Sequence, residues 1–375
     1  MIHTYSTTIR RKEMDAVLTC MVDEKIGPGE LNARFIQQVK QFFGCDGAAA
    51  LRSPQSALKL ALRAIDFEQG GTIMISALAP SWHYQAVEDL GYVPLVLDVD
   101  EATGLVNAEI VQRGINHGGR LLLLHESMGI LPDMESIMAL DIPVIEDISR
   151  SAGALVPSVD EKGEVAEPQK AGSFGVYSIL GLEERDVITA GGGAVIMAPS
   201  RREWIVLKKF VDEIPSVEQL PDINCALGLV QLKEFPRNET ARKEIFALYK
   251  RACMSGRHKL FSRSNNAGEL PAPEVQKGED GSEKQNAALD YTSTMSSFPL
   301  VLTSAFKDVK QYAAKKDIEI VPAYEDSVIA LKQELLEDSC IRAKSLFLRC
   351  ALFPLYPRLS HSNIAKIVKV LGTLP

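Results

Sequence analysis

Two stretches of the chain decide its fold: PVIEDISRSAGAL (Pro143–Leu155) and GSFGVYSILGLEERDVITAGGGAVIM (Gly172–Met197). The first is an apolar run that ends in Glu146-Asp147, so it places a carboxylate at the end of a buried strand. Open α/β sheets present ligand-binding groups at the carboxyl ends of their strands. The second stretch contains a strand, a hydroxyl at Ser178, an irregular turn, a triple glycine and another strand. Together the two stretches predict a site at the edge of a sheet.

Strand-like and helix-like segments alternate through the first half of the chain. The strand-like segments include TIMIS, VPLVLDVD, RLLLLHES and IPVIED, and helices of roughly ten residues separate them. This alternation predicts a mostly parallel, doubly wound sheet. Past Val195 the pattern becomes helical, and a smaller mixed region closes the chain. We therefore expect a large α/β domain over residues 1–240 and a small α+β domain over 241–375, with an exposed insertion at about 262–290.

Composition restricts the class of function. The 375 residues carry a formal net charge of -8, which argues against nucleic-acid binding, because that needs a basic face. The six cysteines form no CxxC pair and no metal-like spacing, so we expect reduced thiols and no metal site. The N-terminal segment has no apolar core of a signal peptide, and no apolar run approaches the ~20 residues that span a bilayer. We expect a soluble, cytoplasmic protein without nucleic-acid or membrane partners.

Further segments follow one another in a characteristic order along nearly the whole chain. They are LRSPQSALKLAL (51–62), GYVPLVLDVDEATGLVN (91–107), LLLLHESMGILPDMESI (121–137), DINCALGLVQLKEF (222–235) and LFPLYPRLSHSNIAKIVKVL (352–371). With the two opening stretches, this order resembles the DegT/DnrJ/EryC1/StrS family, the pyridoxal phosphate (PLP)-dependent aminotransferases of nucleotide-linked keto-sugars. The resemblance implies an α/β, fold-type-I PLP-transferase-like architecture, with a mostly parallel sheet in the large domain and a smaller α+β C-terminal domain. It also implies a homodimer whose subunits share each active site.

The resemblance assigns cofactor-binding roles to five residues. Asp147 lies where the family's carboxylate binds the pyridine nitrogen, a charge-assisted hydrogen bond that contributes roughly 1.5–3 kcal/mol. Ser178 lies where a serine of the family holds the cofactor phosphate. Ser53, Gln55 and Ser56 belong to a turn before a helix, where free backbone N–H groups favour phosphate. These five are the candidates if PLP or pyridoxamine phosphate (PMP) still binds.

The Schiff-base lysine of the family is missing. No lysine or histidine occurs between Ala171 and Gly193, and the position of the family's lysine falls near Glu183. Without an amine on this turn, PLP has no group to hold it as an internal aldimine. The resemblance therefore identifies a degenerate member with no covalently bound cofactor. His125, at the end of another strand, is expected only to pack in the family's His-x-x-Gly bend.

Other parts of the cofactor shell also depart from the family. The small Gly-Thr pair of the phosphate turn becomes Pro54-Gln55, and proline removes a backbone N–H donor. The aromatic residue that stacks on the cofactor aligns with Pro80, and Trp82 or Tyr84 could replace it only after a shift. Together with the missing lysine, these changes remove groups that hold the cofactor in the family.

Three functions are open at this stage. The first is a nucleotide-sugar aminotransferase that uses PLP. The second is an enzyme that uses PLP or PMP without a covalent link, as in the dehydratase branch of the family. The third is a non-catalytic homologue that binds a nucleotide sugar or another small metabolite. The joint loss of the lysine, the stacking ring and the phosphate donors favours the third, with no catalytic residue, and the second is kept as the alternative.

Two arginines complete the expected site. The glutamine that follows the family's aspartate becomes Arg150, and Arg185 lies in the lysine turn. Guanidinium groups suit phosphate and carboxylate, so both are candidate anion-binding residues. Because an unpaired buried carboxylate is costly, we expect Arg150 or Arg185 to form an ion pair with Asp147. We also expect Ser178 and the turn Ser53–Ser56 to converge with them at the sheet edge.

Overall fold

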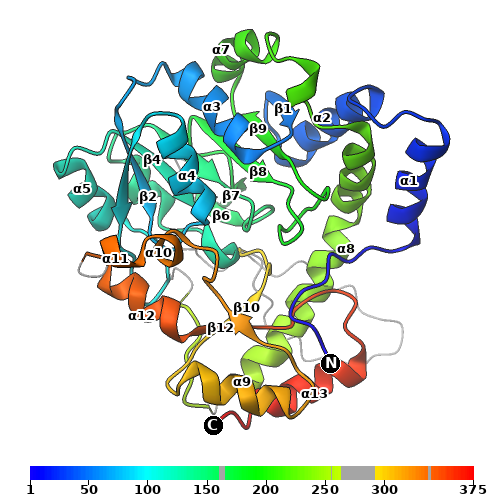
Figure 1. Cartoon of the computed structure of the whole chain (residues 1–375), viewed down its shortest axis with the longest axis vertical. Helices are drawn as coiled ribbons and strands as arrows, with labels where there is room; N and C mark the ends of the chain where they lie inside the picture. Colours follow the sequence, from blue (N-terminus) through cyan, green and yellow to red (C-terminus); the bar gives the residue numbers. More distant parts are fainter. Residues whose placement is uncertain (160–164, 255, 263–291, 337–338) are drawn as a thin grey trace.

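The computed structural model describes residues 1–159, 165–254, 256–262, 292–336 and 339–375. A layered α/β unit fills the upper part of Figure 1, and a smaller group of strands and helices lies below it. The long helix α8 (Asp222–Cys253) runs from one to the other, and both termini lie at the lower end.

A seven-stranded sheet forms the centre of the upper unit, in the order β1-β9-β8-β5-β4-β2-β3. Its strands are β1 (Gly47–Leu51), β2 (Thr72–Ser76), β3 (Val93–Leu97), β4 (Leu121–His125), β5 (Val144–Asp147), β8 (Tyr177–Gly181) and β9 (Ala194–Ala198). Strand β9 is antiparallel to both of its neighbours, and the other pairs are parallel. The expected α/β fold with a mostly parallel sheet is confirmed.

Helices cover both faces of this sheet, which explains why β4 and β5 are buried along their whole length. They are α2 (Glu30–Phe43), α3 (Pro54–Ile65), α4 (Ser81–Asp89), α5 (Ala108–Asn116), α6 (Met134–Met138), α7 (Arg201–Val211) and α8, with short 3-10 turns η1 (Ser127–Gly129) and η2 (Ser216–Glu218). Helix α1 (Arg11–Val22) packs on α8. Ile145 of β5 packs with α3, α4 and α7 on one face. Val144 packs with α5 and α6 on the other. Side chains alternate along a strand, so Asp147 shares the face of Ile145 and Glu146 the face of Val144.

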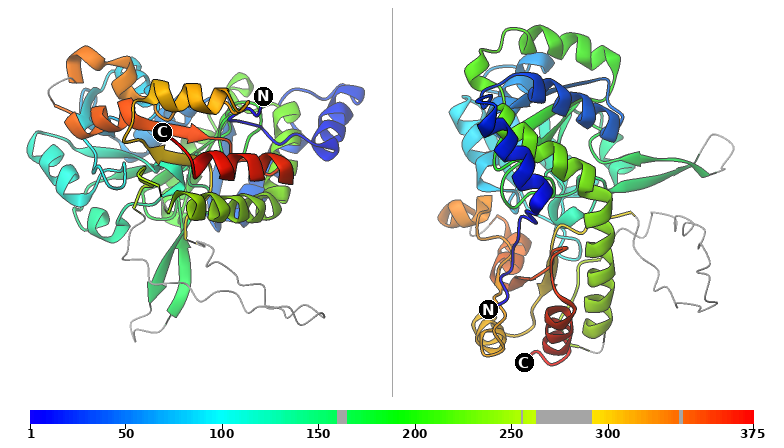
Figure 2. Two further views of the ribbon diagram at one scale, coloured as in Figure 1. Left: turned by 90° about the horizontal axis from the view of Figure 1, so that it is seen from below. Right: turned by 90° about the vertical axis from the view of Figure 1, so that its right-hand side faces the viewer.

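A three-stranded antiparallel sheet forms the smaller unit, in the order β10-β12-β11. Its elements are β10 (Phe298–Val301), α9 (Phe306–Ala314), β11 (Val321–Pro322), α10 (Val328–Leu331), α11 (Gln333–Leu336), α12 (Ile341–Arg349), β12 (Cys350–Phe353) and α13 (His361–Leu371). The N-terminus joins this unit, because Ile2 forms a bridge with Ile318 and is buried in the same core. A two-stranded ribbon, β6 (Leu155–Val159) and β7 (Val165–Lys170), projects away from the body in Figure 2.

The end of the large domain differs in detail from the expectation. The sequence pattern indicates separate helices near 225–235 and 241–251, but α8 continues through Pro236 as one helix of 32 residues. The expected boundary at residue 240 falls inside this helix, so the division into 1–240 and 241–375 stays a proposal. Apart from Ser262, the expected insertion at 262–290 lies outside the described residues. Within the described part of the chain, no helix combines the length and apolarity needed to cross a membrane.

The start of α8 is tied to the start of α2 through one carboxylate. Asp222 accepts hydrogen bonds from the backbone N–H groups of Gly29 (2.9 Å), Leu31 (3.1 Å) and Asn32 (2.8 Å). The first N–H groups of a helix have no partner within the helix. Asp222, itself buried, therefore caps α2 from a different part of the chain.

Replacing this carboxylate should destabilise the protein. In Asp222→Ala three N–H groups at the start of α2 lose their acceptor, so we expect the free energy of unfolding to fall by roughly 2–4 kcal/mol. Urea unfolding followed by circular dichroism measures the change. Asp212→Ala is the matched control, because Asp212 is exposed and pairs only with Lys208 on α7. Equal effects of the two substitutions would contradict the capping role.

Candidate functional site

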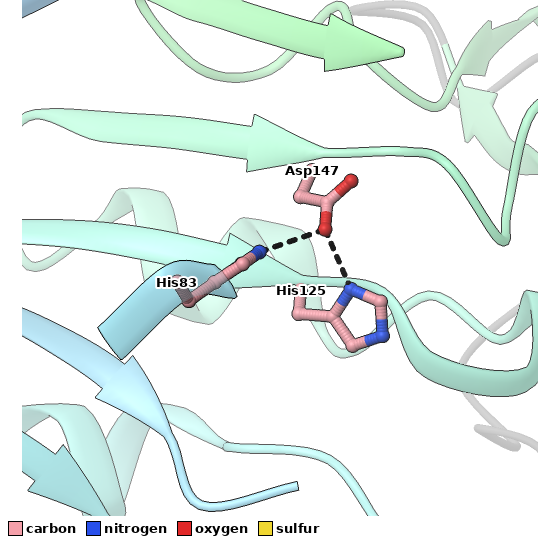
Figure 3. Close-up of side chains that lie close together, drawn as sticks. All are labelled: His83, His125 and Asp147. Atoms are coloured by element: carbon pink, nitrogen blue, oxygen red, sulfur yellow. Dashed lines mark hydrogen bonds and ion pairs between the residues drawn. The ribbon is translucent and has the colours of Figure 1, made fainter. Parts of the chain in front are cut away.

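Three side chains meet at the carboxyl edge of the large sheet, on the face covered by α3 and α4. Asp147 is the last residue of β5, and His125 ends the neighbouring strand β4, directly opposite Asp147 in the register. His83 comes from the first turn of α4, the helix that follows β2. Figure 3 shows the two imidazoles pointing at the same carboxylate. His83 and Asp147 have no exposed side-chain surface, and the side chain of His125 is 5% exposed.

The carboxylate of Asp147 is fully hydrogen-bonded within the chain. His83 Nε2 lies 2.8 Å and His125 Nδ1 lies 2.9 Å from Asp147 Oδ2. The other oxygen, Oδ1, accepts hydrogen bonds from the backbone N–H of Ser149 (3.1 Å) and from the Ser149 hydroxyl. A carboxylate offers about four lone-pair positions. The protein's own donors therefore occupy all of them.

These contacts set the charges of the site. Burial alone would raise the pKa of Asp147, but hydrogen bonds and electrostatic attraction from His125 and then His83 outweigh it and hold this pKa well below its usual range. Burial lowers the pKa of His83, although its hydrogen bond to Asp147 acts in the opposite direction. Asp147 is therefore an anion, and His83 is a neutral imidazole that donates from Nε2.

The expected ion pair between Asp147 and an arginine is wrong. Arg150 Nε lies 3.5 Å from Asp186 Oδ1, and its guanidinium also donates to the carbonyl of Arg185. Arg185 donates to Glu325 (2.9 Å) and lies 4.4 Å over the ring of Tyr5. Both arginines thus have other carboxylates within reach. Two histidines, and no arginine, satisfy Asp147.

Ser178 does not converge with Asp147. It lies opposite Glu146 in the register between β5 and β8, so it faces the other side of the sheet. Its side chain is fully buried, and its Oγ has no hydrogen-bond partner among the described residues. A phosphate role for Ser178 therefore stays a prediction that would require a change in this part of the sheet.

The turn Ser53–Ser56 is already occupied by its own hydrogen bonds. Ser53 Oγ caps α3 by accepting from the N–H of Ser56 (3.1 Å), and the Ser56 hydroxyl donates to Glu218 (2.8 Å). Gln55 Nε2 donates to Asp89 (3.2 Å). Two carboxylates therefore lie beside the turn, and their negative charge disfavours a bound phosphate. A cavity of about 440 Å³ lies between this turn and α4.

Neither Trp82 nor Tyr84, which could replace the family's stacking residue only after a shift, takes the position beside Asp147. The Trp82 ring packs edge-on against His83 at 4.3 Å, and Lys332 covers Tyr84 at 4.4 Å. His83 lies next to the carboxylate instead. The sequence reasoning missed His83 and Ser149. One signal for His83 was available, because the first turn of a helix after β2 lies at the same sheet edge as the ends of β4 and β5.

His125 also borders a cavity of about 110 Å³ beside the smaller unit. Its described lining includes Tyr5, Arg150, Arg185 and Glu325, and none of the lining residues is a lysine. Charged side chains therefore line this cavity together with apolar ones such as Leu78 and Met128, and none of the lining residues offers an amine for a carbonyl carbon.

PLP held in the family's manner does not fit these residues. Asp147 has no free position for a pyridine nitrogen, because four donors of the chain already occupy it. At the start of α3, Pro54 has no N–H group, and the N–H groups of Ser56 and Ala57 are bonded to Ser53. The site thus lacks an open pyridine partner, a phosphate cradle and an amine.

A second buried carboxyl group supports Arg150 and titrates near neutral pH. Asp186 lies in the turn after β8 and accepts the N–H of Glu183 at 2.8 Å. Burial raises its pKa from 3.8 to about 6, although the charge of Arg150 opposes this rise. The folded chain therefore binds a proton that the unfolded chain has already lost. This contribution to stability is complete below pH 3.8 and is lost as the pH rises through about 6.

This linkage predicts a pH-dependent difference between the wild type and Asp186→Asn. Between about pH 4 and pH 7 the wild type should lose up to about 3 kcal/mol more unfolding free energy than the variant, because asparagine does not titrate. Urea unfolding across this pH range measures both slopes, with Asp212→Asn as an exposed control. Parallel curves for the wild type and Asp186→Asn would contradict the raised pKa.

Comparisons with known proteins agree with the fold. The model of the DegT/DnrJ/EryC1/StrS aminotransferase family matches residues 7–372. The GDP-perosamine synthase of Caulobacter vibrioides is 23% identical over 293 residues, which cover 68% of this chain and 75% of that protein. An aminotransferase from Psychrobacter cryohalolentis superposes with a TM-score of 0.79 at 17% identity, over 97% of this chain and 96% of that one.

A dehydratase is equally similar in fold. The E. coli GDP-4-keto-6-deoxy-D-mannose-3-dehydratase, solved with bound hydrated PLP, has a TM-score of 0.79 at 15% identity, over 99% of both chains. At such identities the solved structures establish the fold alone. The family match, in contrast, spans nearly the whole sequence. This chain belongs to the DegT/DnrJ/EryC1/StrS aminotransferase family.

Proposed function

We propose that this chain is a family member that does not use PLP Schiff-base chemistry and instead binds a small metabolite. The observation that carries the proposal is the saturated carboxylate of Asp147. In the family this group is expected to bind the pyridine nitrogen, whereas here His83, His125 and Ser149 supply all its donors. A cofactor would have to displace His83 and leave a buried imidazole without its partner, which is costly.

The turn after β8 supports the same proposal. Its side chains, Glu183, Glu184 and Arg185, cannot form an imine, since glutamate has no amine and arginine stays protonated. The guanidinium of Arg185 is also paired with Glu325.

The ligand class follows from the cavity beside His125 and from the relatives. Arg150 and Arg185 line this cavity beside Glu325 and Asp326, so charged groups of both signs favour a polar ligand. The names of the relatives, a GDP-perosamine synthase and a GDP-keto-sugar dehydratase, make a nucleotide-linked sugar the first class to test. At about 110 Å³ the cavity has room for one small polar group and not for a whole nucleotide sugar.

The second candidate is an enzyme that binds PLP or PMP without a covalent bond. Its support is the likeness in fold to the dehydratase with bound hydrated PLP, together with Asp147 at the expected strand end. It requires that His83 moves away from Asp147 when the cofactor enters. The addition of PLP described next distinguishes the two candidates.

Adding PLP to the purified chain should produce no imine absorption band. Treatment with borohydride should fix no cofactor to a peptide that covers Ala171–Gly193, because this turn contains no amine. Absorbance and peptide mass spectrometry measure both results, with a lysine-containing aminotransferase treated in parallel. A covalent adduct on any lysine would restore the PLP aminotransferase. Tight binding of PLP or PMP without an adduct would favour the second candidate.

We also propose that the chain forms a homodimer. Helix α1 exposes an apolar stripe at helical spacing: Met14 is 51%, Leu18 53% and Met21 56% exposed. An apolar stripe of this kind marks an interaction surface, and a second copy of the chain is the partner that the family resemblance implies. The partner would bury the stripe.

Sedimentation velocity at micromolar concentration should give a dimer. The double substitution Leu18→Glu and Met21→Glu should shift it toward monomer, because it places charges in a buried interface. Val217→Glu is the control, since Val217 is 65% exposed and lies outside α1. A monomeric wild type, or equal effects of both variants, would contradict the proposed interface.

A further inference from the structure

His83, His125 and Asp147 form the one group of histidine, cysteine and acidic residues with metal-ligand spacing within the described ranges of the chain. One donor atom from each lies within 4.8 Å of the other two. We propose that His83 Nε2, His125 Nδ1 and Asp147 Oδ2 bind a divalent transition-metal ion. Two imidazole nitrogens and one carboxylate oxygen are a donor set that suits Zn²⁺ and also Fe²⁺ or Co²⁺. This proposal departs from the expectation of no metal site.

Two of the three separations between the donor atoms are close to what an ion requires, and the third is within 4.8 Å. Around a tetrahedral Zn²⁺ with bonds near 2.0–2.1 Å, neighbouring ligand atoms lie roughly 3.3 Å apart. In the structure Asp147 Oδ2 lies 2.8 Å from His83 Nε2 and 2.9 Å from His125 Nδ1. Each pair would therefore separate by about half an ångström on binding. Small side-chain rotations of this size need no change in the strands or in α4.

The positions of the protons on the two imidazoles are also compatible with metal binding. A ligating nitrogen must present a lone pair, so each imidazole would move its proton to the other ring nitrogen. That nitrogen is Nδ1 in His83 and Nε2 in His125. Asp147 stays ionised, and a neutral ring that moves its proton in this way releases none. The two N–H···O hydrogen bonds in Figure 3 would be replaced by three bonds to the ion.

The surroundings of Asp147 match those of known metal sites, whereas His83 Nδ1 has no hydrogen-bond partner among the described residues. Ligating carboxylates are usually held by hydrogen bonds to their second oxygen, and Asp147 Oδ1 accepts two from Ser149. Gly181 in turn donates its N–H to Ser149 Oγ at 2.8 Å, which fixes that hydroxyl. His125 borders the cavity of about 110 Å³, so a water from this cavity can complete the coordination. Three protein ligands with one water are the composition of catalytic zinc sites, whereas structural sites have four protein ligands.

The inference goes beyond the proposed function, because it concerns an inorganic ion and not the organic ligand. An ion in front of Asp147 would also keep a pyridine ring away from this carboxylate. The two proposals fail separately. A covalent PLP adduct would overturn the proposed function. If no adduct forms and no metal ion binds, this inference alone is overturned.

The test uses the full chain, stripped with a chelator and then titrated with Zn²⁺ or Co²⁺. We expect one equivalent of Zn²⁺ per chain with a Kd below about 1 µM, and Co²⁺ should produce visible d–d absorption bands. Isothermal titration calorimetry and absorbance report these results. Failure of the wild type to bind one equivalent by either method would overturn the proposal.

Two conservative variants separate metal ligation from hydrogen bonding. In His83→Gln and His125→Asn an amide N–H takes the place of the imidazole nitrogen and still donates to Asp147 Oδ2. Each variant should therefore fold, as circular dichroism can check, yet bind Zn²⁺ at least about 100-fold more weakly. His117→Gln is the matched control, because His117 is an exposed histidine bonded to the Arg113 carbonyl at the end of α5. Unchanged affinity in the two folded variants would overturn the assignment.

Discussion

The buried carboxylate of Asp147 holds together the part of the molecule that contains the candidate site. Its hydrogen bonds join α4 through His83, β4 through His125 and the turn after β5 through Ser149. Ser149 Oγ then receives the N–H of Gly181 at the end of β8. Leaving a buried carboxylate unpaired costs several kcal/mol. The position of α4 against the sheet edge is therefore coupled to how this single charge is satisfied.

The neighbouring carboxylate has a structural role on the opposite face. Glu146 accepts the backbone N–H groups of Gly172 (2.9 Å), Phe174 (2.8 Å) and Gly175 (2.6 Å). These bonds hold the turn that leads into β8. Because successive side chains of a strand point to opposite faces, the Glu146-Asp147 pair supplies one group that fixes the turn and another that faces the site.

Sequence reasoning could place Asp147 and not its partners. An apolar run that ends in a carboxylate is a local signal, and the alternating pattern was sufficient for the parallel sheet. The choice between arginine and histidine as the partner of Asp147 depends on distances in space. Arg150 is three residues from Asp147 in the sequence, but Asp186 is the carboxylate within its reach. His83 and Asp147 are 64 residues apart, so only the packing of α4 on the sheet reveals their contact.

The same constraint explains how the fold can be kept while the chemistry changes. A carboxylate at this strand end needs a positive or hydrogen-donating neighbour, and a pyridinium, an imidazole N–H and a metal ion all meet that need. Removing the cofactor without a substitute would leave an uncompensated charge in the core. Here a histidine from α4 donates to Asp147, so the chain's own residues compensate this charge. A second histidine on the same oxygen adds more than this compensation requires. One histidine is enough to compensate the carboxylate, whereas an ion site needs both nitrogen donors.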